Sequence, residues 1–120
     1  MVDAGESDDT LSILPLDLAA PIPNITLKGV AGNDHFVENF DSSVTLEGGP
    51  GDDSYVLHGS TVTVDEILGD DHYTILGDSP SDNITVNDAS GSDSYFEDGE
   101  GTVDLNDAGT GDDEYTLHGS

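Results

Sequence analysis

Residues 48–56 read GGPGDDSYV, and this stretch decides the fold. It contains a glycine, any residue, an aspartate, any residue and an aromatic residue, and this short motif occurs five times in 120 residues. The copies begin 19, 18, 22 and 20 residues apart: GNDHF at 32–36, GDDSY at 51–55, GDDHY at 69–73, GSDSY at 91–95 and GDDEY at 111–115. A unit that returns at such short, nearly constant intervals indicates a stacked repeat architecture.

A second segment precedes each copy of the motif: NITL from residue 24, SVTL from 43, TVTV from 61, NITV from 83 and TVDL from 102. In both segments apolar and polar residues alternate, as they do in strands that bury one face. No stretch has the periodicity of a helix, so the repeat predicts two short strands and two turns per unit. The side chains expected to point inward are Ile25, Leu27, Phe36, Val44, Leu46, Tyr55, Leu57, Val62, Val64, Tyr73, Ile75, Ile84, Val86, Tyr95, Val103, Leu105, Tyr115 and Leu117.

Two strands and two turns make one coil of a solenoid, in which each strand pairs in parallel with its counterpart one repeat later. We therefore expect an all-β fold, a right-handed parallel β-roll or β-solenoid of about five coils of about 19 residues. Residues 1–23 are expected to form a polar tail and an N-terminal cap, and the β-roll repeats to occupy 24–120. The third coil is the longest, with its extra residues in a loop around Asp78, Ser79 and Pro80. The expected coils are 24–42, 43–60, 61–82, 83–101 and 102–120.

The charge balance excludes several classes of function. The chain has 27 acidic residues against a single basic one, Lys28, and a net charge of −26. Nucleic acids and anionic membrane surfaces are repelled by such a chain, because Lys and Arg are the residues that hold phosphates. No apolar run is long enough to cross a bilayer, so no membrane insertion is expected. The absence of Cys excludes disulfides, thiolate zinc sites and a Cys nucleophile.

Nothing in the pattern indicates an enzyme. Carboxylates are so numerous that the choice of a catalytic pair would be arbitrary, and the chain has no Arg, no Cys and no clustered His. We therefore expect no catalytic residues and a structural role. The four His residues occupy repeat positions and are expected to be exposed: His35, His58, His72 and His118.

The aspartate of each motif stands immediately before an expected strand. Stacked coils place these carboxylates about a strand spacing apart, which is unfavourable for like charges unless a cation lies between them. A site made only of oxygen atoms suits a hard cation, and Ca²⁺ accepts flexible coordination geometry more readily than Mg²⁺. The repeat therefore predicts calcium binding along one edge of the solenoid.

Residues 48–56 match in full the nonapeptide GGxGxDxUx, with U a large apolar residue, of the RTX family of haemolysin-type calcium-binding repeats. The chain resembles this family over 24–120, although the other four copies lack one or both leading glycines. The resemblance implies a parallel β-roll that binds Ca²⁺ between successive turns. The glycine–aspartate loops lie on one edge only, and in this the coils resemble the repeats of a bacterial RTX ice-binding adhesin. Carried over to this chain, the metal-binding positions are Asp34, Asp53, Asp71, Asp93 and Asp113, with Gly32, Gly51, Gly69, Gly91 and Gly111.

The function that these observations imply is that of a calcium-binding structural module of a secreted RTX-type protein. Its inward apolar side chains are few for the ordering of 97 residues, so bound metal is expected to supply part of the folding free energy. We expect the module to fold when Ca²⁺ binds outside the cell, after type I secretion, and to be extracellular or at the cell surface. The expected partners are calcium ions, together with end-to-end self-association or further repeats of a longer parent chain.

Two other interpretations remain open. The outward positions of the first strands are rich in Thr and Asn, and such a face suits a segment of a surface adhesin or an ice-binding protein. Alternatively, the acidic residues only solvate the surface of a salt-adapted solenoid, which high salt folds without specific ions. The Thr residues on the outward face include Thr26, Thr45, Thr63 and Thr85.

Overall fold

The computed structural model describes residues 2–13, 24–39, 43–59, 61–109 and 111–118. These residues form twelve strands and no helix. All twelve strands lie in two six-stranded sheets, ordered β1-β3-β5-β7-β9-β11 and β2-β4-β6-β8-β10-β12. The strands are β1 (Val2–Gly5), β2 (Thr10–Ile13), β3 (Ile25–Val30), β4 (His35–Glu38), β5 (Ser43–Glu47), β6 (Ser54–Leu57), β7 (Thr61–Asp65), β8 (His72–Ile75), β9 (Asn83–Asp88), β10 (Ser94–Glu97), β11 (Thr102–Asp107) and β12 (Glu114–Leu117).

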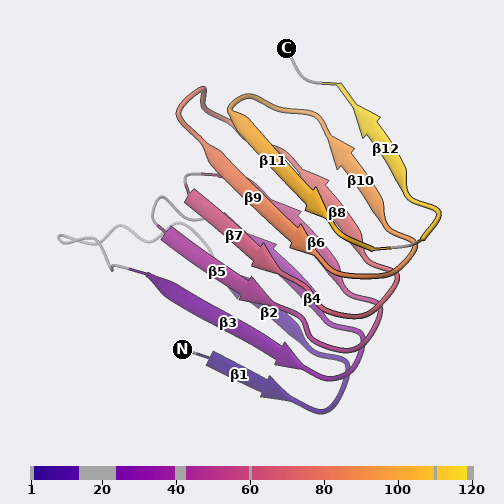
Figure 1. The fold of residues 1–120 in the computed structure, drawn as a ribbon. Coiled ribbons are helices and arrows are strands. Elements are labelled where there is room, and N and C mark those ends of the chain that lie inside the picture. Colours follow the sequence, from indigo (N-terminus) through magenta and orange to yellow (C-terminus); the bar gives the residue numbers. More distant parts are fainter. Residues whose placement is uncertain (1, 14–23, 40–42, 60, 110, 119–120) are drawn as a thin grey trace, which may run out of the picture.

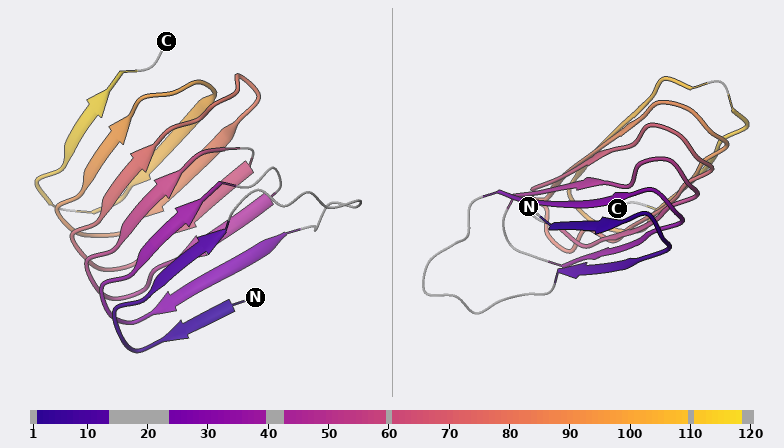
Figure 2. Two further views of the ribbon diagram at one scale, coloured as in Figure 1. Left: turned by 180° about the vertical axis from the view of Figure 1, so that it is seen from behind. Right: turned by 90° about the horizontal axis from the view of Figure 1, so that it is seen from below.

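The chain passes from one sheet to the other at every turn, so that each circuit adds one strand to each sheet (Figures 1 and 2). Every strand pairs in parallel with its counterpart one circuit away, as Phe36 does with Tyr55, 19 residues later. The expected parallel solenoid is therefore confirmed. The loop insertion of the third coil is also confirmed. Within this loop, Oδ2 of Asp82 accepts hydrogen bonds from the backbone N–H groups of Asp78 and Ser79, at 3.0 and 2.9 Å.

The solenoid begins earlier than the repeat indicates. Strand β1 pairs with β3 and β2 pairs with β4, so residues 2–13 form a circuit of their own. Within the expected polar tail, Ser7 stands in the turn before β2 where Gly32 stands in the next circuit. This circuit is hard to recognise in the sequence because its turn lacks the motif glycine. The remainder of the expected cap, 14–23, lies outside the described residues.

The aromatic residue of each motif stacks on its counterpart one circuit away. Ring centroids are 4.8–5.0 Å apart, with interplanar angles of 5–6°. Because this spacing matches the distance between paired strands, backbone pairing and ring stacking favour the same register. The stack consists of Phe36, Tyr55, Tyr73, Tyr95 and Tyr115.

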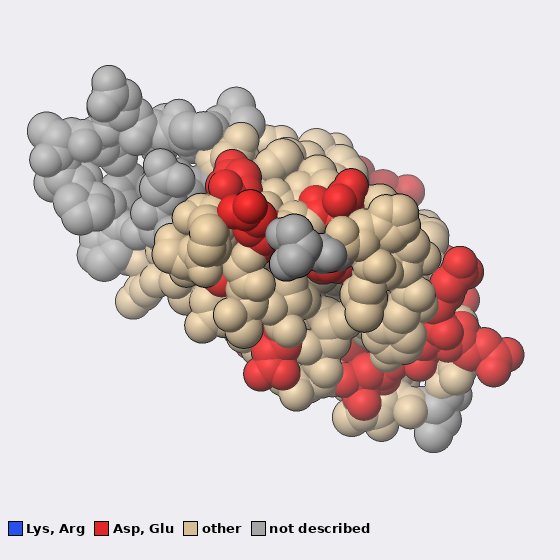
Figure 3. All heavy atoms as spheres, turned by 90° about the horizontal axis from the view of Figure 1, so that it is seen from above, with Lys and Arg blue, Asp and Glu red and all other residues tan. Residues whose placement is uncertain are grey.

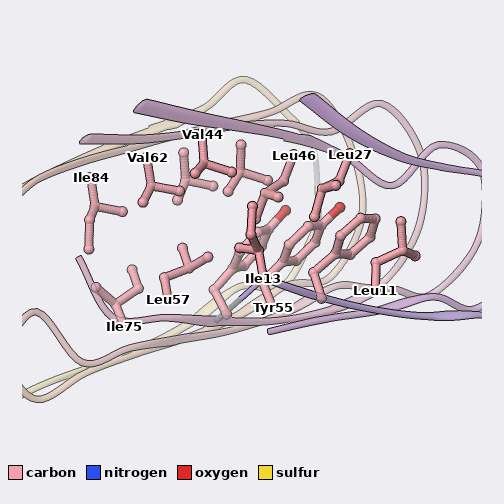
Figure 4. Packing of buried hydrophobic residues seen from close by; sticks show 14 of the residues in the cluster. Leu11, Ile13, Leu27, Val44, Leu46, Tyr55, Leu57, Val62, Ile75 and Ile84 are labelled. Atoms are coloured by element: carbon pink, nitrogen blue, oxygen red, sulfur yellow. The ribbon is translucent and has the colours of Figure 1, made fainter. Parts of the chain in front are cut away.

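Apolar side chains from both sheets fill the space between them (Figure 4). Most of the side chains expected to point inward are buried, and Leu11 and Ile13 of the first circuit join them. Tyr115 and Leu117 are not buried, at 48% and 64% exposed, although Tyr115 stacks on Tyr95 as an inward residue does. These two residues lie on β12, which is the end strand of its sheet and pairs on one side only. The expected core residues that pack only partly against the others are Ile25, Val103 and Leu105.

Gly69→Ala tests how closely successive turns approach. A methyl group at Gly69, whose φ is 154°, would overlap the backbone carbonyl oxygen of Gly51. Because backbone atoms cannot move aside as a flexible side chain does, we expect the free energy of unfolding to fall by about 3 kcal/mol or more. Urea denaturation followed by circular dichroism measures this loss.

Gly5→Ala is the matched control. Gly5 also has a positive φ, 129°, but an added methyl group would meet nothing within 4 Å. This variant should lose only about 1–2 kcal/mol, from backbone strain alone. Equal losses in the two variants would contradict the close approach of the turns.

Candidate metal centre

The five predicted loop aspartates form a row along one edge of the solenoid. Each stands immediately before a strand of the second sheet, and its Oδ1 accepts the backbone N–H of the corresponding aspartate one circuit earlier. Stacked aspartates therefore bind the backbone of their neighbours directly, a contact that the repeat pattern does not reveal. The N to Oδ1 distances are 2.9 Å from Asp9 to Asp34, 2.6 Å from Asp34 to Asp53, 2.7 Å from Asp53 to Asp71, 2.8 Å from Asp71 to Asp93 and 3.0 Å from Asp93 to Asp113.

The second oxygen of each buried loop carboxylate has no hydrogen-bond partner. Asp34, Asp53, Asp71 and Asp93 are at most 2% exposed, and their Oδ2 atoms accept no hydrogen bond. In the part of the chain that the structure describes, the only other buried side-chain oxygen or nitrogen without a partner is Oδ1 of Asp88. Burial of a carboxylate oxygen without a compensating contact is costly. These atoms therefore fit a positively charged ligand.

Three further carboxylates face this row from the first sheet. Glu66 follows β7, and Asp88 and Asp107 end β9 and β11. The parallel pairing makes their positions equivalent. The motif does not include these residues, but a signal for them exists in the sequence. The alternation of inward residues, continued two positions past Val64, Val86 and Leu105, reaches all three acids.

The carboxylates of the two sheets gather into three groups. In each group one oxygen per residue lies within 4.8 Å of the others, an arrangement that can hold a metal ion. Because all of these side chains ligate through oxygen, a hard cation suits the groups best. Among the described residues, Asp34 belongs to none of the three groups, although it continues the same row. The groups are Asp53 with Glu66 and Asp71, Asp71 with Asp88 and Asp93, and Asp93 with Asp107 and Asp113.

Tyrosine hydroxyls fix the positions of the first-sheet acids. Burial raises the pKa of Tyr55, Tyr73 and Tyr95, so that these hydroxyls stay protonated and donate. Phe36 is the residue of the stack without a hydroxyl. In its circuit, Gly29 occupies the position that an acid occupies in the later circuits. The hydrogen bonds run from Tyr55 to Glu66, from Tyr73 and Tyr95 to Oδ2 of Asp88 at 2.9 and 3.1 Å, and from Tyr115 to Oδ2 of Asp107 at 3.0 Å.

Burial also raises the pKa of the carboxyl groups. It raises the pKa of Asp71 to about 8 and that of Glu66 to about 7. The pKa values of Asp53 and Asp93 rise to about 6 for the same reason. Backbone N–H donors partly oppose the rise, and the charge of neighbouring carboxylates adds to it. Without a bound cation, folding near neutral pH therefore favours proton uptake by these groups, whereas a cation lets them stay ionised.

The predicted glycine positions lie at the same edge as the loop aspartates. The five motif glycines stack in the turns between the sheets. Gly32 lies close to the carbonyl of Ser7, and each of the other four lies close to the carbonyl of the motif glycine one circuit earlier. Their part in metal binding stays a prediction. The described His residues are exposed or, for His58, half-buried, and none belongs to a carboxylate group.

On the face shown in Figure 3, acidic side chains lie among uncharged ones and no basic side chain is visible. Lys28 forms an ion pair with Glu47 at 2.6 Å.

Comparisons of the chain with protein-family models, with curated proteins and with solved structures gave no match. Within the described ranges, no helix has the length and apolar character that a membrane crossing requires. The interpretation of the carboxylate edge therefore depends on its own geometry and chemistry.

The raised pKa values predict how the stability of the metal-free protein depends on pH. The ordinary pKa values of Asp and Glu are about 3.9 and 4.3, so the folded state binds more protons than the unfolded state between about pH 4 and pH 8. The free energy of unfolding in EDTA should therefore fall as the pH rises through this window. The strand signal in circular dichroism, recorded in EDTA at pH 5 and at pH 8, measures the change, and a larger strand signal at pH 8 would contradict the prediction.

Asp71→Asn separates this effect from general charge repulsion. The neutral amide resembles the protonated acid, and its oxygen can still accept the N–H of Asp53. We expect the variant to be more stable than the wild type in EDTA at pH 8, with a weaker dependence on pH. Asp104→Asn removes the same charge from an exposed position. This variant should leave the dependence of stability on pH nearly unchanged.

Proposed function

We propose that this chain is a calcium-binding structural module of a secreted RTX-type protein, and that Ca²⁺ completes its folding outside the cell. The observation that carries the proposal is the set of buried Oδ2 atoms without partners on Asp34, Asp53, Asp71 and Asp93. These are the aspartates of the repeated motif, in the turns where the RTX resemblance leads us to expect the metal.

Calcium suits the carboxylate groups better than other common cations. With Ca–O distances of about 2.3–2.6 Å, one Ca²⁺ spans oxygen atoms that lie up to about 5 Å apart. This range accommodates carboxylate oxygens within 4.8 Å of one another. Mg²⁺ prefers shorter bonds and a rigid octahedron. Zn²⁺, Cu²⁺ and Ni²⁺ favour imidazole or thiolate ligands, which the groups do not contain.

Net charge supports a role for calcium as a folding switch. At −26 the chain repels itself, and self-repulsion opposes the compact state. In a calcium-poor cytosol the chain stays extended and suited to secretion, and the higher calcium concentration outside the cell brings the turns together. We propose no catalytic activity, because backbone amides and tyrosine hydroxyls already bind one oxygen of most of these carboxylates.

A calcium titration followed by circular dichroism tests this function. In EDTA, at low salt and neutral pH, we expect little strand signal, because the buried carboxylates repel one another. Adding Ca²⁺ should produce a saturable gain of strand signal and a higher thermal midpoint. Mg²⁺ at equal concentration and NaCl at equal ionic strength should give much smaller changes. The same spectrum and thermal midpoint in EDTA and in Ca²⁺ would defeat the proposal.

One observation favours a second candidate function, that of an adhesin or ice-binding segment. Thr26, Thr45, Thr63 and Thr85 stand directly opposite one another in successive strands of the first sheet. Their regular spacing follows from parallel pairing and makes a row of hydroxyl groups. Thermal hysteresis of the calcium-loaded protein would distinguish this function from a purely structural one.

A further inference from the structure

We propose that Asp88 is a direct ligand of a multivalent cation held between Asp71 and Asp93. This ion is the middle member of a row of three, and the row is confined to the circuits from β6 to β12. The inference rests on the proposed calcium-binding function and deepens it, since it names ligands outside the repeated motif and places the ions along the solenoid.

The two oxygens of Asp88 have different surroundings. Oδ2 accepts the hydroxyls of Tyr73 and Tyr95 at 2.9 and 3.1 Å, whereas Oδ1 is buried and has no partner. Asp71 and Asp93 show the same division, because a backbone N–H donates to Oδ1 of each and Oδ2 has no partner. Three carboxylates, each fixed through one oxygen and lacking a partner at the other, make a preorganised cation site.

Charge favours an ion in each of the three groups. Asp71 and Asp93 each belong to two groups, so the three groups share ligands and form one continuous row. The seven carboxylates of the row carry a formal charge of −7 when ionised, and three divalent cations would supply +6. The single basic residue of the chain, Lys28, forms its ion pair with Glu47, which is outside these groups. The seven are Asp53, Glu66, Asp71, Asp88, Asp93, Asp107 and Asp113.

The earlier circuits lack the third carboxylate. In the parallel pairing, Gly29 and Gly48 are the equivalents of Glu66 and Asp88. Added methyl groups at these two glycines would overlap Oδ2 of Asp34 and Asp53. Glycine has no side chain to offer at either position, so these circuits do not supply the same third ligand.

Asp88→Asn tests the assignment, with Asp104→Asn as its control. Both variants lose one negative charge, but Asp104 is exposed on β11. Because ligand charge sets the affinity of calcium sites, we expect Asp88→Asn to raise the Ca²⁺ midpoint of folding by on the order of tenfold or more. Asp104→Asn should stay within about twofold of the wild type, since exposed charges are screened. Circular dichroism measures the midpoints, and native mass spectrometry counts the bound ions.

A second variant keeps the test decisive if Asp88→Asn does not fold. Asp88→Gly combined with Tyr73→Phe and Tyr95→Phe reproduces the local arrangement of Phe36 and Gly29, which this chain already contains. The triple variant should fold in saturating Ca²⁺ and bind one ion fewer than Asp104→Asn.

The results separate this inference from the function on which it rests. If the wild type folds with Ca²⁺ while Asp88→Asn and the triple variant keep the midpoint and ion count of Asp104→Asn, the role of Asp88 is overturned and the proposed function stands. If the wild type itself binds no Ca²⁺, both are overturned. A raised midpoint or a lost ion in the Asp88 variants alone supports the inference.

Discussion

Parallel pairing at the strand spacing is the constraint on which the rest of the structure depends. Because each circuit repeats the path of the last, a residue and its counterpart stand about 4.8 Å apart whatever their chemistry. Apolar and aromatic side chains gain from this repetition, and the stack from Phe36 to Tyr115 is its result. Carboxylates are destabilised by it, because like charges at this distance repel one another.

The edge of the solenoid relieves that repulsion in part. Backbone N–H groups donate to one oxygen of each loop aspartate, and tyrosine hydroxyls donate to the acids of the first sheet. The tyrosines thereby link the core to the candidate metal centre, since their rings stack in register and their hydroxyls orient the acids. The oxygens left without partners converge where a cation would complete the site, so folding and ion binding depend on the same register.

Much of this architecture could be predicted from the sequence because a solenoid is built from local repeats. The motif spacing predicts two strands per coil, parallel pairing, the loop near Asp78 and the row of loop aspartates. Prediction fails at the two ends. Ser7 replaces the motif glycine and hides the first circuit, and Leu117 lies on an end strand that pairs on one side only. A repeat describes what each coil shares with its neighbours, and an end coil lacks one neighbour.

The sequence by itself determined the coil, since alternating apolar residues and a glycine–aspartate turn suffice for two strands and the bend between them. It also determined that Asp88, two residues after Val86, lies on the same inward face of its strand. Only the tertiary structure decided that Asp71, Asp88 and Asp93 meet, because these residues come from different strands and turns. Their separation depends on the register between circuits and on the distance between the two sheets, and neither quantity is a property of a single coil.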